Sequence, residues 1–164
     1  MTINMIAAVC ENGVIGNWWR LPWDSLSGDM ARFRNRITWQ AIVMGKNTYE
    51  SLRSYYPEDQ GHPFAGENIV LSTSLEPHQW LIICKDVREV LDKYPNQELL
   101  VIGGAETYKA FLPYTDTAEL TWLGWEYEWD THFPISDLLE TFQETQRMPW
   151  LDSGTEYVTY VRKN

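Results

Sequence analysis

IVMGKNTYESL (residues 42–52) and LLVIGGAETYKAF (residues 99–111) share one pattern. In both, an apolar run typical of a buried strand leads into glycine and then directly into a helical pattern. Such a turn presents backbone N–H groups and the positive end of a helix dipole, which suit a phosphate. Two such turns predict a dinucleotide held across the carboxyl edge of a parallel sheet. Neither GxGxxG nor GxxxxGKS/T is present, so this is not a standard Rossmann fingerprint or P-loop.

The pattern continues along most of the chain. Apolar segments at 6–9, 41–44, 68–72 and 99–104 predict strands that are covered on both faces. Between them, the spacing predicts helices at roughly 27–37, 47–53, 86–94 and 105–112. Alternating strands and helices predict an α/β fold, and 164 residues fit a single domain over 1–164.

The last third differs from this alternation. AELTWLGWEYEWD (118–130) and EYVTYVRK (156–163) alternate apolar and polar residues, which predicts antiparallel strands at one edge of the sheet. The aromatic row Trp125, Tyr127 and Trp129 could stack on nucleic-acid bases. Packing in the core or at the sheet edge is the better interpretation, because the net charge is −10.

Composition excludes several classes of function. The net charge of −10 disfavours a nucleic-acid or anionic-membrane partner. The two cysteines, Cys10 and Cys84, lie in separate apolar segments, as expected of buried thiols in a reducing compartment. His62, His78 and His132 are scattered, so no metal site is expected. No signal peptide or membrane span is visible, and we expect a cytoplasmic protein.

One acidic residue stands out in LPWDSLSGDMARF (21–33). At helical spacing Asp29, Phe33 and Ile37 form one stripe, so Asp29 would face the interior with its apolar neighbours. Two interpretations stay open: a carboxylate that grips a ligand in an apolar cleft, or a solvent-facing acid in the first helical turn. Three arginines fall mostly off this stripe: Arg32, Arg34 and Arg36.

The segments around the stripe suggest how a ligand would be covered and held. ENGVIGNWWRLPWD (11–24) contains two glycines, a proline and aromatic residues, which fits a lid over a cofactor or an ordinary ordered connection. Cationic and hydroxyl partners for an extra phosphate follow strand ends or turns at Lys46, Ser72, Thr73 and Lys85.

With these pieces in order, the chain resembles the dihydrofolate reductase family. The resemblance rests on IAAV, VIG, LPW, DMARF, VMGKNTYES, NIVLS, VIGGAETY and DTHFP, which follow one another in the family's order. It implies a mostly parallel eight-stranded sheet with an antiparallel C-terminal edge and about four flanking helices. It also implies a monomer that transfers a hydride from NADPH to C6 of 7,8-dihydrofolate, with protonation at N5.

The resemblance assigns the catalytic and substrate-binding positions. Asp29 would hold N3–H and the 2-amino group of the pterin, and Thr121 would bond that carboxylate. Trp23 would order a nearby water, and Leu21 would limit solvent. The implied substrate-binding residues are Ile6, Ala8, Asp29, Met30, Phe33, Arg34, Leu52, Ile102 and Thr121.

The implied cofactor contacts cluster around the glycine turns and strand ends. They are Ala8, Ile15, Gly16, Gly45, Lys46, Asn47, Thr48, Leu71, Ser72, Thr73, Lys85, Ile102, Gly103, Gly104, Ala105, Glu106, Thr107 and Tyr108.

The chain departs from the family pattern in three places. Asp29 lies one residue further from Trp23 than in many bacterial members, which leaves Asp24 as an alternative carboxylate. Glu106 stands where several members carry arginine. Gly66 and Glu67 stand where the family usually has an arginine for the substrate's glutamate tail, and Arg34 or Arg53 would replace it.

Two other functions remain open at this point. One is a reductase of the same fold that acts on another pterin or on a ribosylaminopyrimidine. The other is a non-catalytic module that binds a nucleotide or a drug.

Overall fold

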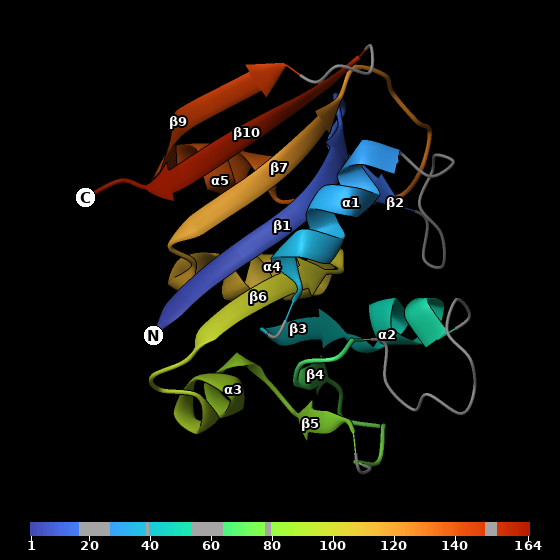
Figure 1. Ribbon diagram of the computed structural model, residues 1–164, viewed down its shortest axis with the longest axis vertical. Coiled ribbons are helices and arrows are strands. Elements are labelled where there is room, and N and C mark those ends of the chain that lie inside the picture. The colour runs from blue at the N-terminus through green and yellow to red at the C-terminus, as the bar shows by residue number, and fades with distance from the viewer. Residues whose placement is uncertain (17–26, 39, 54–63, 78–79, 150–153) are drawn as a thin grey trace.

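An eight-stranded sheet forms the middle layer of the molecule (Figure 1). The computed structural model describes residues 1–16, 27–38, 40–53, 64–77, 80–149 and 154–164, with only the backbone described at 27–30. The strand order is β5-β4-β3-β6-β1-β7-β10-β9. The first six strands of this order are parallel, and β10 is antiparallel to both β7 and β9.

The strands have the following bounds: β1 Thr2–Cys10, β2 Val14–Gly16, β3 Ala41–Gly45, β4 Asn68–Leu71, β5 Ile82–Cys84, β6 Glu98–Gly103, β7 Thr117–Leu123, β8 Thr131–His132, β9 Phe142–Pro149 and β10 Thr155–Arg162. The short strands β2 and β8 pair with each other outside the main sheet.

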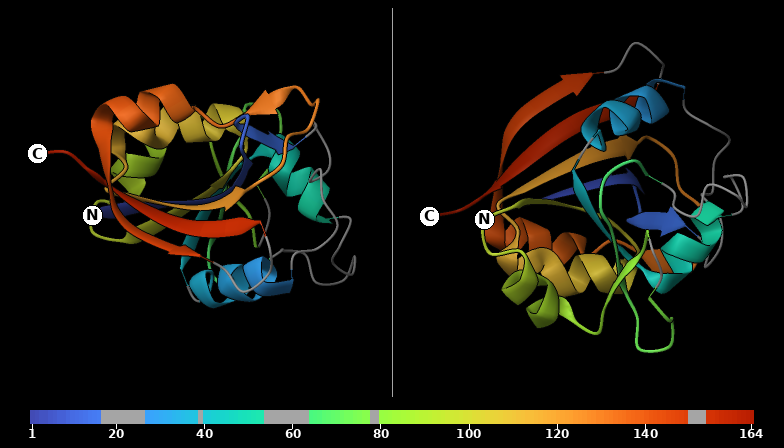
Figure 2. Two further views of the ribbon diagram at one scale, coloured as in Figure 1. Left: turned by 90° about the horizontal axis from the view of Figure 1, so that it is seen from above. Right: turned by 60° about the horizontal axis from the view of Figure 1, so that its bottom comes forward.

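Helices cover both faces of the sheet (Figure 2). On one face, α3 (Val87–Lys93), α4 (Ala105–Phe111) and α5 (Ile135–Thr141) contribute Val90, Phe111 and Leu138 to the larger core cluster. On the other face, α1 (Ser27–Arg36) and α2 (Lys46–Arg53) pack Phe33 and Tyr49 against a second cluster. A short 3-10 helix, η2 (Leu112–Tyr114), follows α4.

The inner strands are apolar throughout because both of their faces are covered. In β3, Val43 belongs to the larger cluster, whereas Ile42 and Met44 belong to the second. In β1, Met5 and Ala7 face α3–α5, and Ile6 between them faces α1 and α2. Successive side chains of a strand point to opposite faces, so each strand needs a continuous apolar run.

The α/β class, the mostly parallel eight-stranded sheet and the antiparallel C-terminal edge are all confirmed. The expected four strands and four helices all form, with shifted ends. Helix α5 is a fifth helix that was not predicted. The edge strand β9 and the short strands β2, β5 and β8 were also missed.

The prediction about the C-terminal third was right for 156–163 and only partly right for 118–130. Thr117–Leu123 is strand and pairs antiparallel with β10, but it also runs parallel to β1, and the strand does not extend to residue 130. Trp125, Tyr127 and Trp129 follow in non-strand backbone. They pack as partly buried side chains against a third cluster around Cys10. Their alternation therefore reflects burial on one side of an extended segment, and packing was the correct interpretation of the aromatic row.

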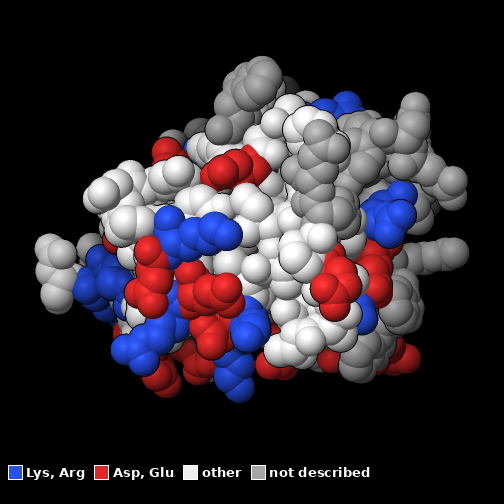
Figure 3. Space-filling view, turned by 90° about the horizontal axis from the view of Figure 1, so that it is seen from below, with Lys and Arg blue, Asp and Glu red and all other residues white. Residues whose placement is uncertain are grey.

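The surface is strongly charged but mixed in sign. On the face shown in Figure 3, Lys and Arg side chains are interspersed with Asp and Glu beside an uncharged area. Within the described residues, no helix is long and apolar enough to cross a membrane.

Candidate active site

The two glycine turns lie side by side at the carboxyl edge of the sheet. β3 ends at Gly45 and β6 ends at Gly103, and because the strands are parallel neighbours their ends meet. A Cβ added to Gly45 would lie 2.7 Å from the Thr107 Oγ1 atom in α4, and one added to Gly104 would lie 3.4 Å from the Thr48 Oγ1 atom in α2. The absence of side chains at these glycines is what lets the two helix starts approach so closely.

A cluster of hydroxyl and ammonium groups lies next to the first turn. The Lys46 Nζ donates a hydrogen bond to the Ser74 Oγ at 2.9 Å and lies 3.8 Å from a Glu50 carboxylate oxygen. The Ser72 Oγ accepts from the backbone N–H of Ser74 at 3.1 Å, and the Ser72 N–H donates to the Cys84 carbonyl at 3.0 Å. These bonds hold the loop after β4 against the end of β5.

Most of the predicted cofactor residues lie at the carboxyl edge of the sheet. Leu71, Ser72 and Thr73 end or follow β4, and Lys85 follows β5 with an exposed side chain. Those at the two turns and helix starts are Gly45, Lys46, Asn47, Thr48, Ile102, Gly103, Gly104, Ala105, Glu106, Thr107 and Tyr108. Ala8 lies in β1, and Ile15 and Gly16 lie in β2.

Tyr108 ties the second turn to the central strand. Its hydroxyl donates a hydrogen bond to the Ile6 carbonyl at 2.8 Å, and both residues are buried. A Cβ at Gly103, where φ is +124°, would lie 3.2 Å from the Tyr108 hydroxyl. The Tyr108 ring also packs on Phe133, with centroids 4.9 Å apart. The ring thus fixes the distance between α4 and β1.

The predicted substrate residues gather on the other side of β1, beneath α1 and α2. Ile6, Phe33, Leu52 and Ile102 all belong to or pack against the second core cluster. Ala8 in β1 is the register partner of Thr121 in β7, whose side chain is only 2% exposed. Phe33 also contacts Phe64 edge to face, with centroids 5.9 Å apart.

Several predicted residues cannot be placed. Leu21, Trp23 and Asp24 lie outside the described residues. Asp29 is the third residue of α1, but its side chain and that of Met30 also lie outside what the structure describes. Arg34 lies on α1 with an exposed side chain, and the Arg53 guanidinium lies 5.9 Å from the Tyr49 ring centroid.

Two of the α1 arginines expected to fall mostly off the inward stripe still reach the sheet. The Arg32 Nη2 lies 2.7 Å from one Glu119 carboxylate oxygen, and the Arg36 Nη2 lies 2.7 Å from the other. Arg32 also donates to the Thr121 Oγ1 at 3.4 Å. Arg32 and Arg36 follow Asp29 by three and seven residues, and these positions flank the stripe on the sheet side. Arginine is favourable at both positions because the Glu119 carboxylate lies opposite on β7.

Sequence reasoning missed three residues of this region. Ser74 was visible only as the end of an STS run, and its bond to Lys46 spans 28 residues. Arg32 and Glu119 are 87 residues apart, so neither one signals the other in a local pattern.

Both thiols are buried. Burial raises the pKa of Cys10 to about 11. Burial also raises the pKa of Cys84, with a further contribution from the nearby Glu89 and Asp86 carboxylates. Both cysteines are free thiols, and neither environment favours a reactive thiolate.

Together these features are those of a dinucleotide-binding α/β protein, with paired glycine turns at the carboxyl edge and an apolar cluster beneath α1 and α2. Residues 2–162 match the family model described as dihydrofolate reductase. The dihydrofolate reductase of Haemophilus influenzae is 36% identical over 136 residues, which cover 82% of this chain and 79% of that protein. The dihydrofolate reductase of Bacillus subtilis is 31% identical over 172 residues, which cover 99% of this chain and 95% of that protein.

A solved structure shows the same fold. The dihydrofolate reductase from Enterococcus faecalis, complexed with NADP(H) and RAB-propyl, superposes with a TM-score of 0.84 at 23% identity. The match covers 99% of this chain and 97% of the other. The chain belongs to the dihydrofolate reductase family.

Proposed function

We propose that the chain reduces 7,8-dihydrofolate to tetrahydrofolate with NADPH, in keeping with its family. It is an oxidoreductase: C6 of the substrate receives a hydride and N5 receives a proton. The observation that carries the proposal is the pair of abutting glycine turns next to the Thr121 side of β1. Such an arrangement would suit a dinucleotide site with a pterin pocket beside it.

The residues present fit NADPH. Gly45 and Gly104 let two helix starts lie against each other, and Lys46 adds a cation. Bound NADPH would supply the hydride. Lys46, Thr48, Ser72, Thr73 and Lys85 would hold its phosphates, since ammonium and hydroxyl groups at helix starts suit these anions.

Asp29 is our candidate for the carboxylate that binds the pterin. It precedes Phe33 by four residues in α1, and residues at that spacing share a helix face. Phe33 packs toward the sheet. A carboxylate there would accept N3–H and the 2-amino group in a bidentate pair, and would favour protonation at N5. Thr121 would bond that carboxylate, while Leu21 and Trp23 would control the water that brings the proton.

The remainder of the pocket would hold the substrate by apolar contact. Ile6, Ala8, Met30, Leu52 and Ile102 would line it. Exclusion of water there would strengthen the hydrogen bonds to the polar edge of the ring. The apolar contacts would hold C6 against the hydride donor.

We also propose that Arg34 takes the place of the missing tail-binding arginine, since its side chain is exposed on the pocket-covering helix. We expect a cytoplasmic monomer that folds as a single domain and has no nucleic-acid partner. Sedimentation measurements at several protein concentrations would test the expected monomeric state.

The decisive experiment measures NADPH oxidation with dihydrofolate, a tail-less dihydropterin and a ribosylaminopyrimidine as alternative acceptors. We expect turnover at micromolar dihydrofolate. Asp29→Asn should lower the single-turnover hydride-transfer rate at neutral pH about a hundredfold and steepen its dependence on acid. Asp24→Asn is the matched control and should have little effect. An Asp29→Asn enzyme as fast as the wild type at every pH would remove Asp29 from this role, and NADPH binding without turnover of dihydrofolate would refute the function.

A further inference from the structure

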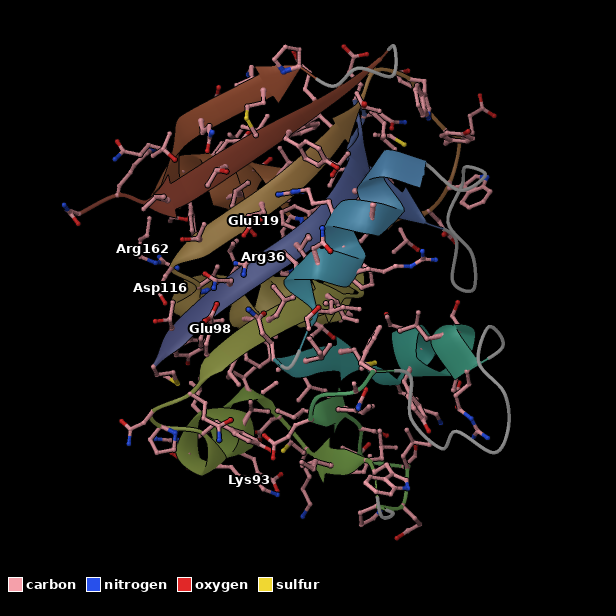
Figure 4. The ribbon with its side chains drawn as sticks, viewed as in Figure 1. Arg36, Lys93, Glu98, Asp116, Glu119 and Arg162 are labelled. Atoms are coloured by element: carbon pink, nitrogen blue, oxygen red, sulfur yellow. The ribbon has the colours of Figure 1, made fainter. Side chains whose placement is uncertain are left out.

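A partly buried ion-pair network joins helix α1 to the strand that carries Thr121. Glu119 accepts from Arg32 at 2.7 Å through one oxygen and from the Arg36 Nε at 2.8 Å through the other. The side chains of Arg32 and Glu119 are only 20% and 15% exposed. Figure 4 shows Arg36 and Glu119 close together beside α1 and β7.

Arg32 is the member of this network that reaches the pocket. Its Nη1 donates to the Thr121 Oγ1 at 3.4 Å, and its guanidinium carbon lies 4.0 Å above the centroid of the Tyr157 ring. Thr121 and Tyr157 are register partners in β7 and β10. Three contacts therefore fix the guanidinium plane: a carboxylate, a hydroxyl and an aromatic face.

We propose that Arg32 is a positioning residue for the reaction: its guanidinium bridges Glu119 and Thr121 and thereby sets both the direction of the Thr121 hydroxyl and the charge balance beside the pterin. This inference rests on the proposed function.

The first part follows from hydrogen-bond chemistry. A threonine hydroxyl has one hydrogen to donate and two lone pairs to accept with. Because Arg32 can only donate, its bond occupies a lone pair of the Thr121 oxygen and leaves the hydroxyl hydrogen for an acceptor on another side. In the proposed site the Asp29 carboxylate would be that acceptor. Arg32 thus acts on the carboxylate through Thr121.

The second part follows from charge. A lone cation near the pterin would oppose the proton that N5 must accept, whereas Glu119 compensates for Arg32 at 2.7 Å. The other described charged or titratable groups around Arg32 are Arg36 on α1 and Tyr157 on β10. Glu98 on β6 is a further neighbour of Arg36, at 3.8 Å.

Removal of Arg32 and removal of Glu119 should shift the midpoint pH of the hydride-transfer rate in opposite directions. Arg32→Leu removes a cation and leaves Glu119 paired with Arg36, so the midpoint pH of the hydride-transfer rate should rise by about 0.5 unit or more. Glu119→Gln leaves the cation under-compensated, so the midpoint should fall by a similar amount. A merely structural role would slow or destabilise both variants without shifting their midpoints in opposite directions.

Two further variants separate position from charge. Arg32→Lys keeps the charge but cannot reach Glu119 and Thr121 together, so its midpoint should stay within about 0.2 unit of wild type while its rate falls. Arg36→Leu is the matched control: it removes the other partner of Glu119 but no contact to Thr121, and should shift the midpoint less than half as far as Arg32→Leu.

A binding measurement complements the kinetics. Without NADPH, quenching of tryptophan emission should show folate bound about fivefold more weakly by Arg32→Leu than by wild type. Unchanged folate affinity together with unshifted midpoints in Arg32→Leu and Glu119→Gln would overturn the inference, as would midpoints that move in the same direction. These failures would leave turnover of dihydrofolate by the wild-type enzyme intact, whereas failure of the proposed function would remove that turnover.

Discussion

Substituting Gly45 by alanine should separate the two turns that hold the cofactor. The new Cβ would lie 2.7 Å from the Thr107 Oγ1 atom, whereas ordinary contact begins at 3.4 Å. Relief therefore requires a displacement of about 0.7 Å between the start of α2 and the first turn of α4. Thr107 is buried, so its side chain cannot simply swing into solvent.

The cost of this overpacking should be about 1–3 kcal/mol in the free energy of unfolding. For a domain of this size that corresponds to a fall in Tm of roughly 2–12 °C. Displacement of the turns should also weaken NADPH binding by about tenfold or more. A misplacement of about 1 Å can lower a reaction rate about a hundredfold, and binding contacts are sensitive to position in the same way. Dihydrofolate affinity should stay within about twofold, because the pocket beneath α1 is separate from the turns.

Thermal unfolding and fluorescence titrations with each ligand measure these effects. A double variant supplies the control: Thr107→Ser can turn its hydroxyl away from the new methyl group, so Gly45→Ala with Thr107→Ser should recover at least half of the lost Tm. If Gly45→Ala matches the wild type in Tm and NADPH affinity, the contact does not set the spacing of the turns. If the double variant recovers nothing, Thr107 is not the obstacle.

Three other measurements test separate features. Tyr108→Phe removes the hydrogen bond to the buried Ile6 carbonyl and should cost about 1–2 kcal/mol in urea unfolding; an unchanged midpoint would contradict its structural role. Arg34→Ala should raise the KM for dihydrofolate several-fold with little change for NADPH, and an unchanged KM would exclude Arg34 from tail binding. Because its folded pKa is about 11, Cys10 should be about one-thousandth thiolate at pH 8, and the raised pKa of Cys84 acts in the same direction. A thiol reagent should therefore modify both cysteines only after unfolding, and fast labelling of the native protein would contradict their burial.

The sequence predicts the features that depend on local patterns. Residues 41–45 and 98–103 form strands because continuous apolar runs suit strands buried on both faces, and the glycines at their ends turn the chain into α2 and α4. The parallel arrangement then brings the two turns together without further information. The motif order supplies the family.

Features that depend on distant partners were not predictable in this way. Arg32 faces the sheet because Glu119 lies opposite, and that pairing spans 87 residues. Residues 125–129 alternate like a strand but form none, because their side chains pack on Cys10 and Leu123 without a neighbouring strand to bond. The role of Asp29 remains a prediction, since its side chain lies outside the described part of the structure.

The central place of β1 has a consequence for how the protein is made. This strand precedes its partners β6 and β7 by about a hundred residues, as the bond from the Ile3 N–H to the Asp116 carboxylate, 113 residues away, illustrates. A nascent chain therefore carries an apolar segment with both edges unpaired until β6 and β7 have been made. Such delayed closure slows folding and exposes the segment to aggregation. The strand order thus makes β1 a segment at which aggregation can start before the sheet closes.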